Sequence, residues 1–225
     1  MNITYLLVNL GLLLLSALLF SGRQLNFALN SKYIILAVLI NVFAFSISTE
    51  FLSQFKVLVF NPPYLTGMML WQLPIEELLL LMMLPLCGLA IYLFLNVRYP
   101  DQQLEKYSLA VSHIVLGICI AMLFFGHQKL YTLFTFVILL VLLLYIEYVN
   151  KIRFMYRFYR AYLVSLIPFY IVYGILTSAP VLQYTNSETL DFNLVNIPFE
   201  NHFYYLSMLL LSVYLFELFK SRAKQ

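Results

Sequence analysis

Glutamates at the start of long apolar segments are the residues of this sequence best suited to chemistry. Glu76 and Glu77 stand side by side in "LWQLPIEELLLLMML" (residues 70–84), just where an apolar run begins. A charged side chain at the centre of a bilayer costs about 2.5–3.5 kcal/mol on insertion scales. Acids in this place therefore need a reason, and holding a proton in a dry environment is one that a carboxyl group can supply.

A related segment starts the last apolar run of the chain. The motif "LPIEELLLLMML" recurs as "IPFENHFYYLSM" at 197–208, with Pro74 matching Pro198 and Glu76 matching Glu200. Proline followed by acids is ordinary helix-start chemistry, since the positive helix end stabilises an acid by about 0.3–1 kcal/mol. A helix start does not require Glu twice, however, so the duplication favours a functional role for both glutamates.

Membrane helices are the elements that must position these acids. Hydrophobic residues make up 63% of the 225 residues and charged residues only 10%, a composition far from that of soluble domains. A membrane-spanning helix needs about 20 largely apolar residues. We therefore predict an all-α, polytopic membrane helical bundle of about seven transmembrane helices, at residues 3–20, 33–50, 74–97, 107–125, 130–149, 161–179 and 197–219.

Each acidic segment begins the third span of a group of three, which predicts a parallel 3+1+3 internal repeat. The predicted units are a first repeat 1–106, a linker span 107–129 and a second repeat 130–225. Parallel repeats would set Glu76 and Glu200 at the same depth, facing one another across a pseudo-two-fold axis. Residues 76 and 77 differ by about 100° around a helix. We therefore expect only one to point inward, and the match with Glu200 selects Glu76.

Basic residues gather on one side of the predicted bundle. Of the 13 Lys and Arg residues, all except Lys56 and Lys129 fall in the loops or the tail of that side. The positive-inside rule then places the N-terminus outside and the C-terminus in the cytoplasm, in the plasma membrane. These basic residues account for the net charge of +3, so no nucleic-acid partner is predicted. The expected partner of the outer surface of the bundle is membrane lipid. The unpaired acids gather at the opposite, outer side: Glu50, Glu76, Glu77, Glu188, Asp191 and Glu200.

Aromatic residues lie near these acids. The chain has 20 Phe, 18 Tyr and one Trp, and those beside the acids are Tyr64, Trp71, Tyr184, Phe203, Tyr204 and Tyr205. Tyr204 follows Glu200 by one helical turn and so lies on the same helix face. A carboxylic acid in a dry cleft can create a carbocation by transferring its proton to a bound molecule. The negative faces of nearby aromatic rings then attract that cation.

Other kinds of site find no support in the sequence. His113 and His202 lack metal-ligand spacing, so we expect packing or hydrogen-bonding roles for them and no metal site. No Gly-x-Gly-x-x-Gly follows a strand, which argues against a dinucleotide or flavin fingerprint. No cofactor is predicted.

Three segments of the chain resemble a known family. "FNPPYLTGMMLWQLPIEE" (60–77), "ILTSAPVLQY" (175–184) and "NIPFEN" (196–201) are similar to the lycopene cyclase family of small integral-membrane carotenoid cyclases. In that family two homologous halves occur as separate subunits or in one fused chain. The resemblance covers essentially the whole chain, which looks like the fused form. The second family motif usually reads Pro-Ile-Glu-Asp, whereas this chain has Asn201 at the last position and no carboxylate there.

The resemblance implies an intramolecular lyase of the lycopene β-cyclase type, without flavin or metal. Its partner would be lycopene or a related linear carotenoid, whose ends are cyclised to β-ionone rings in a redox-neutral reaction. The products would be γ- and β-carotene. The implied catalytic residues are Glu76, Glu200 and Glu77. The residues expected to bind substrate are Asn61, Pro62, Pro63, Tyr64, Trp71, Pro74, Pro198 and Tyr204.

Two other classes of function stay open at this point. Small-solute transporters also use a parallel 3+1+3 arrangement with a midplane site, although the middle of these spans is almost wholly Leu, Ile, Phe and Val. The second is a non-catalytic carotenoid- or quinone-binding membrane subunit. The sequence also leaves open which glutamate is the acid, whether one or both ends react, the C40 or C50 substrate, the ring type, and whether the chain forms a homo-oligomer.

Overall fold

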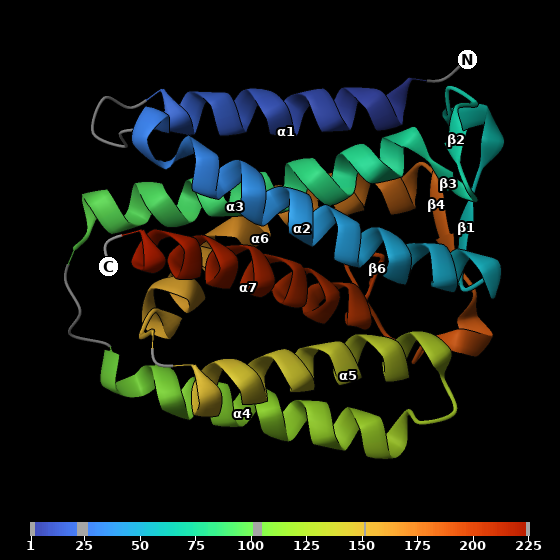
Figure 1. Ribbon diagram of the computed structural model, residues 1–225. Coiled ribbons are helices and arrows are strands. Elements are labelled where there is room, and N and C mark those ends of the chain that lie inside the picture. Colours follow the sequence, from blue (N-terminus) through green and yellow to red (C-terminus); the bar gives the residue numbers. More distant parts are fainter. Residues whose placement is uncertain (1–2, 22–26, 101–104, 151, 224–225) are drawn as a thin grey trace.

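The computed structural model describes residues 3–21, 27–100, 105–150 and 152–223, and these form a bundle of helices (Figure 1). The described residues contain seven α-helices: α1 (Thr4–Phe20), α2 (Phe27–Gln54), α3 (Ile75–Arg98), α4 (Glu105–Phe125), α5 (Leu130–Leu144), α6 (Met155–Ser178) and α7 (Phe199–Arg222). A π-helical turn, η3 (Tyr145–Val149), continues α5.

These helices confirm the predicted all-α membrane bundle. Six of them are long and apolar enough to cross a membrane, and the apolar helix α1 is shorter. With 17 residues, α1 is at the lower end of the length that spans a bilayer. Helix α6 begins at Met155, earlier than the predicted span 161–179. The difference arises because the Arg- and Tyr-rich stretch before 161 is helical without being apolar.

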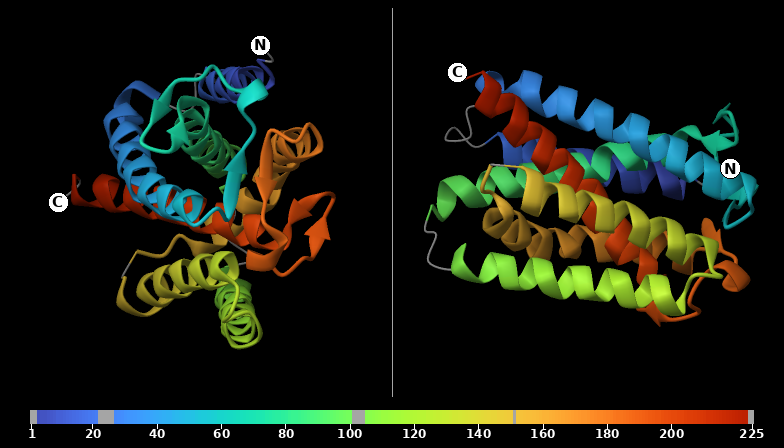
Figure 2. Two further views of the ribbon diagram at one scale, coloured as in Figure 1. Left: turned by 90° about the vertical axis from the view of Figure 1, so that its right-hand side faces the viewer. Right: turned by 60° about the horizontal axis from the view of Figure 1, so that its bottom comes forward.

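Helices α3 and α7 form the centre of the bundle (Figures 1 and 2). Helix α1 packs on α3 and α5 packs on α7, whereas α2 packs on both α3 and α7 and α6 packs mainly on α3. Helices α3 and α7 approach closely at Gly88, where an added Cβ would lie 2.6 Å from Leu209 Cδ1 and 2.9 Å from the Tyr205 hydroxyl. The glycine therefore lets the two central helices meet.

Short strands cover the end of the bundle where α3 and α7 begin. The strands are β1 (Leu58–Phe60), β2 (Met69–Leu70), β3 (Leu73–Pro74), β4 (Leu182–Tyr184), β5 (Asn193–Leu194) and β6 (Ile197–Pro198). Strands β2 and β3 form one hairpin, and β5 and β6 form another. Two 3₁₀ turns, η2 (Pro62–Tyr64) and η4 (Asn186–Glu188), lie between the strands. In Figure 2, left, the two hairpins lie on different sides of the β1–β4 pair.

The β1–β4 pair joins the two halves of the chain. The pairing is antiparallel, with Leu58 opposite Tyr184 and Phe60 opposite Leu182. Two flanking backbone hydrogen bonds repeat the same relation: the Asn61 N–H donates to Val181 O at 3.0 Å, and the Thr185 N–H donates to Val57 O at 3.0 Å. A reciprocal contact of this kind is what a two-fold relation between similar segments produces.

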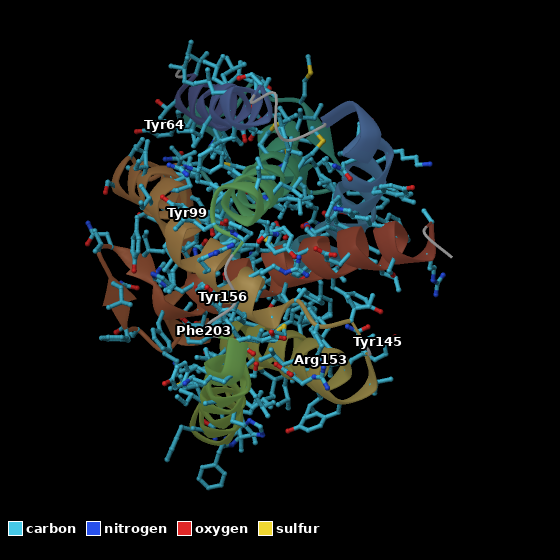
Figure 3. The ribbon with its side chains drawn as sticks, turned by 90° about the vertical axis from the view of Figure 1, so that its left-hand side faces the viewer. Tyr64, Tyr99, Tyr145, Arg153, Tyr156 and Phe203 are labelled. Carbon is cyan, nitrogen blue, oxygen red and sulfur yellow. The ribbon has the colours of Figure 1, made fainter. Side chains whose placement is uncertain are left out.

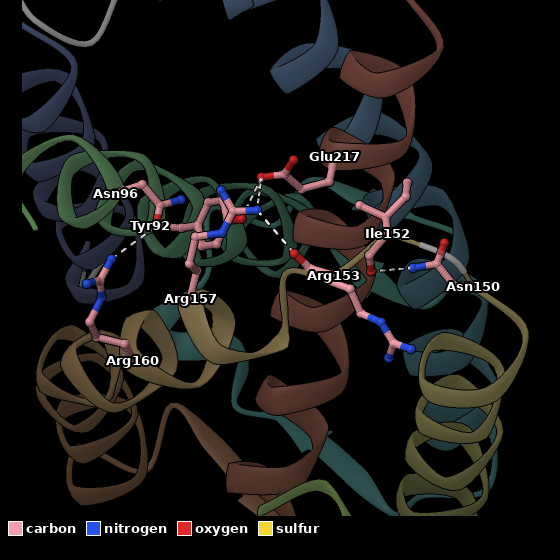
Figure 4. A network of polar contacts seen from close by, with 8 residues as sticks. All are labelled: Tyr92, Asn96, Asn150, Ile152, Arg153, Arg157, Arg160 and Glu217. Atoms are coloured by element: carbon pink, nitrogen blue, oxygen red, sulfur yellow. Dashed lines mark hydrogen bonds and ion pairs between the residues drawn. The ribbon is translucent and has the colours of Figure 1, made fainter. Parts of the chain in front are cut away.

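The opposite end of the bundle is basic and is held by a polar network (Figures 3 and 4). The Arg160 guanidinium donates to the Tyr99 carbonyl at 2.7 Å and to the Leu95 carbonyl at 3.1 Å, and so satisfies the free carbonyls at the end of α3. The Tyr92 hydroxyl donates to Glu217 at 2.5 Å, and Arg157 lies 3.9 Å from the same carboxylate. Of the basic residues predicted for this side, Arg23, Lys151 and Lys224 lie outside the described residues.

Candidate active site

Helices α3 and α7 start in the same way, directly after a hairpin strand. Pro74 and Pro198 are the residues before the first helical turn, and both are buried. Proline suits this position because it has no N–H to leave unsatisfied. The next backbone N–H donates back across each hairpin, from Ile75 to Met68 O at 3.0 Å and from Phe199 to Phe192 O at 2.9 Å. The hairpins thus fix where the acids of the first turn point.

Glu76 is held at one carboxyl oxygen by the loop of its own half. The side chain is 2% exposed. Its Oε1 accepts a hydrogen bond from the Thr66 backbone N–H at 2.6 Å. Its Oε2 is buried and has no hydrogen-bond partner among the described residues. Since nearly all buried polar groups in proteins are paired, this oxygen is available to a ligand.

Glu200 has the same arrangement with one addition. Its side chain is fully buried, and its Oε1 accepts from the Leu190 backbone N–H at 2.8 Å, again ten residues back along the chain. The Thr132 hydroxyl of α5 also donates to Oε1, at 2.7 Å. Within the described part of the chain, Oε2 of Glu200 is buried without a partner, like that of Glu76.

The residue after each of these glutamates is also buried and contacts a tyrosine. Glu77 accepts a hydrogen bond from the Tyr5 hydroxyl of α1. Asn201 accepts one from the Tyr131 hydroxyl of α5 at 2.7 Å, and its Nδ2 donates to the Tyr184 hydroxyl at 2.5 Å. Tyr131 and Tyr184 also stack, with ring centroids 5.5 Å apart.

The expectation that only one of the two adjacent acids points inward is wrong. Glu76 is 2% exposed and Glu77 is 4% exposed. An angle of about 100° separates them around the helix, but here the interior surrounds the helix start from two directions. The loop of the same half covers one side and α1 covers the other. Moreover, the hydrogen bonds of Glu76 and Glu200 are made within their own halves and not across the two-fold relation.

Two tyrosines lie close to the helix starts: Tyr204 is in the second turn of α7, and Tyr184 contacts Asn201. The Tyr204 ring is 5% exposed and packs edge-on against Phe45 at 5.1 Å. Its hydroxyl contacts the Ser48 and Thr49 hydroxyls at 2.9 and 3.0 Å. Burial raises the pKa of the Tyr184 phenol well above its ordinary value, and the nearby Glu77 carboxylate acts in the same direction. Tyr184 therefore remains neutral at physiological pH and contacts the site as a hydrogen-bonding ring.

The remaining predicted substrate-binding residues lie farther out. Trp71 occupies the turn of the β2–β3 hairpin with φ of 57°, and its side chain is 68% exposed. Pro62 and Pro63 are exposed in η2, whereas Tyr64 is half-buried. The Asn61 side chain donates to the Pro180 carbonyl at 3.2 Å and so ties the two loops together. The role of these residues in substrate binding stays a prediction.

Three site residues were missed because they lie on spans without a motif. Tyr5, Tyr131 and Thr132 belong to α1 and α5, whose sequences are otherwise almost wholly apolar. The one available signal was the repeated tyrosine near the start of both helices. No sequence pattern indicates that these hydroxyls reach the first turns of α3 and α7.

Comparison with known proteins agrees with this arrangement. The family model described as lycopene cyclase matches the chain in two segments, residues 2–95 and 128–219. The chain belongs to the lycopene cyclase family. Each matched segment contains one of the hairpin-led helix starts described above, and α4 lies between the segments. No curated protein and no solved structure matches the chain significantly.

Membership of the lycopene cyclase family supports a carotenoid cyclase role and a carotenoid substrate, and two apolar grooves on the bundle surface suit such a molecule. One groove, of about 500 Å³, runs between α1 and α6 and is lined by residues that include Thr4, Val8, Gly11, Pro168 and Ile175. The other, of about 360 Å³, runs between α2 and α5 and includes Phe45, Ser48, Val137 and Val141. Ser48 and Phe45 contact Tyr204, so the groove between α2 and α5 borders a residue of the candidate site. The groove between α1 and α6 is lined by Thr4, which precedes Tyr5 on the same helix.

Proposed function

We propose that this chain cyclises the linear ends of lycopene to β-ionone rings, giving γ- and β-carotene. The observation that carries the proposal is the pair of buried carboxyl oxygens, Oε2 of Glu76 and of Glu200, that have no partner among the described residues. An alkene offers no hydrogen-bonding group, so a carboxyl group that acts on it must keep one oxygen free of the protein. Family membership supports the same reaction.

The reaction needs one proton donor and one proton acceptor and no redox chemistry. A carboxyl group adds a proton to C2 of the terminal C1=C2 bond and leaves a cation at C1. The C5=C6 bond then forms the C6–C1 bond, which closes the ring and moves the cation to C5. Loss of the C6 proton to a carboxylate makes the C5=C6 bond of the β-ring. One proton is gained and one is lost, so the product is an isomer of the substrate.

We assign the proton donor to the first half, at Glu76 with Glu77 in support, and the acceptor to Glu200. Oε1 of Glu200 receives two hydrogen bonds, whereas Oε1 of Glu76 receives one. A carboxylate accepts hydrogen bonds and donates none. The carboxyl group that receives more hydrogen bonds, Glu200, is therefore better suited to be the carboxylate that accepts the proton. Rings such as that of Tyr204 would stabilise the intermediate cation, and the polyene would extend into an apolar groove.

The two matched segments support a duplication of the parallel 3+1+3 kind, with units 1–106 and 130–225 joined by the linker span 107–129. We propose that the hairpin end faces outward and the basic end faces the cytoplasm of the plasma membrane, as the distribution of Lys and Arg predicts. The site would then lie near the outer surface, where a carotenoid could enter sideways from the lipid.

The test is the pigment profile of bacteria that accumulate lycopene, with and without this chain. Conversion to γ- or β-carotene by the wild type, lost in Glu76→Gln and Glu200→Gln, is the expected result. Unchanged lycopene in cells that express the chain well would contradict the proposal and would favour a transporter or a non-catalytic subunit. Full activity in both variants would overturn the acid and base assignment.

A further inference from the structure

Thr132 makes the one side-chain hydrogen bond that distinguishes Glu200 from Glu76 within the described residues. Thr132 is fully buried on α5, and its hydroxyl donates to Oε1 of Glu200 at 2.7 Å. The corresponding residue of the first half follows Tyr5 as Thr132 follows Tyr131, and it is Leu6, which has no hydroxyl. Helix α5 lies beside α7 (Figure 1), so the contact joins two packed elements.

Two donors from different directions fix the orientation of the Glu200 carboxyl group. The Leu190 N–H comes from the loop before β5 and the Thr132 hydroxyl comes from α5. A carboxyl oxygen has two lone pairs, and both lone pairs of Oε1 are then occupied. The proton can be accepted only at Oε2, the oxygen without a partner among the described residues.

We propose that Thr132 is a positioning residue that aims Oε2 of Glu200 at one C–H bond of the cyclised cation and thereby determines the ring type. This inference rests on the proposed function. The C5 cation has three neighbouring carbons that carry hydrogen: C6, C4 and the methyl group on C5. Transfer of a proton from C6 to Oε2 gives the β-ring, from C4 the ε-ring, and from the methyl group the γ-ring. In each case the C–H electron pair becomes the new double bond, and no oxidant is needed.

The chain offers a matched control one helical turn away. Thr135 lies on the same helix and is also fully buried, but its hydroxyl has no partner among the described residues. Thr132→Val and Thr135→Val therefore remove the same atoms from the same helix, and only the first breaks a hydrogen bond to Glu200. Thr132→Ser keeps the hydroxyl and serves as a rescue variant.

The experiment measures kcat, KM and ring type with lycopene and the full-length chain in membranes, after the amount of each variant has been equalised. For Thr132→Val we expect kcat to fall about tenfold, as loss of a hydrogen bond to a charged group predicts. KM should stay within about twofold, and ε- or γ-rings should appear beside β-rings. Thr135→Val should match the wild type, and Thr132→Ser should restore β-rings.

Other outcomes would overturn the inference. A Thr132→Val enzyme with wild-type kcat and only β-rings would show that the hydroxyl does not aim the base. Equal losses in Thr132→Val and Thr135→Val would assign the effect to packing of α5. A wild type that makes no rings would overturn the proposed function and this inference with it, whereas a wild type that makes β-rings upholds the function whatever the variants do.

Discussion

The starts of α3 and α7 share a scaffold but differ in the chemistry of their side chains. Both begin after a two-strand hairpin and a buried proline, and both hold a glutamate through a backbone N–H ten residues earlier. In the first half the next residue is Glu77, bonded to Tyr5, whereas in the second half it is Asn201, bonded to Tyr131 and Tyr184. The second half adds Thr132, where the first has Leu6.

This difference suggests how a duplicated site can divide the work of one reaction. The backbone contacts that hold Glu76 and Glu200 are the same in the two halves. The first half carries two carboxyl groups and the second carries one carboxyl group with an extra donor. This difference in side chains would make the first half the proton donor and the second half the proton acceptor.

The largest effect is expected from removing either glutamate with a free oxygen. Glu76→Gln and Glu200→Gln should each lower cyclase activity by about 10³-fold, since general acid–base catalysis contributes about 10²–10⁴-fold. Glu50→Gln is the matched control, because Glu50 is also buried but hydrogen bonds from Gln54 and the Gln72 N–H occupy its two oxygens. Product analysis in lycopene-accumulating cells measures all three. A Glu50 variant as inactive as the other two would show that a free carboxyl oxygen does not mark the catalytic glutamates.

A smaller effect is expected at the position where the halves differ. Glu77→Gln should lower kcat about 10-fold to 100-fold, within the range of acid–base contributions, because it removes a carboxyl group from the proton-donating half. Asn201→Asp should stay within about threefold of the wild type, because the Tyr131 and Tyr184 hydroxyls can both donate to a carboxylate. The double variant should be as slow as Glu77→Gln alone. If the second carboxylate restored activity, the halves would be interchangeable.

The two grooves allow a third comparison. Gly11→Phe would fill the groove between α1 and α6 and should raise KM about tenfold, a change of about 1.4 kcal/mol in binding. Val137→Phe tests the groove between α2 and α5 in the same way. Gly117→Phe on α4 is the control, since this glycine also has open space beside it but lines neither groove. Equal KM values for all three variants would show that neither groove binds the substrate.

The smallest effect on catalysis is expected at the other end of the bundle. Arg160→Met removes the hydrogen bonds to the end of α3 and should lower the free energy of unfolding by about 1–3 kcal/mol. Activity per folded molecule should not change. Thermal unfolding in detergent, measured beside activity, checks both. A loss of kcat in the folded variant would show that the site depends on more than the helix starts.

The spans were predictable because a bilayer demands a long apolar run, and each predicted span corresponds to one helix, although α2 and α6 begin six residues before their predicted spans. The hairpins were not, because Trp71 and Val195 adopt positive φ in the turns, where Gly or Asn is usual, and Asn196 alone is a weak signal for the second turn. Glu76 and Glu200, which the duplicated motif selected as candidate catalytic residues, are both buried. The partners from α1 and α5 could not be predicted, since no pattern indicates which span packs on which helix start.

The most direct test follows deuterium from heavy water into the carotenoid. The wild type should place one deuterium at C2 of each new ring. Glu200→Gln should form no rings but should return lycopene labelled at C2, because the donor still protonates the alkene and the cation then loses hydrogen or deuterium from the same carbon. Glu76→Gln should return unlabelled lycopene. Labelled rings from Glu76→Gln, or unlabelled lycopene from Glu200→Gln, would contradict a proton donor in the first half and an acceptor in the second.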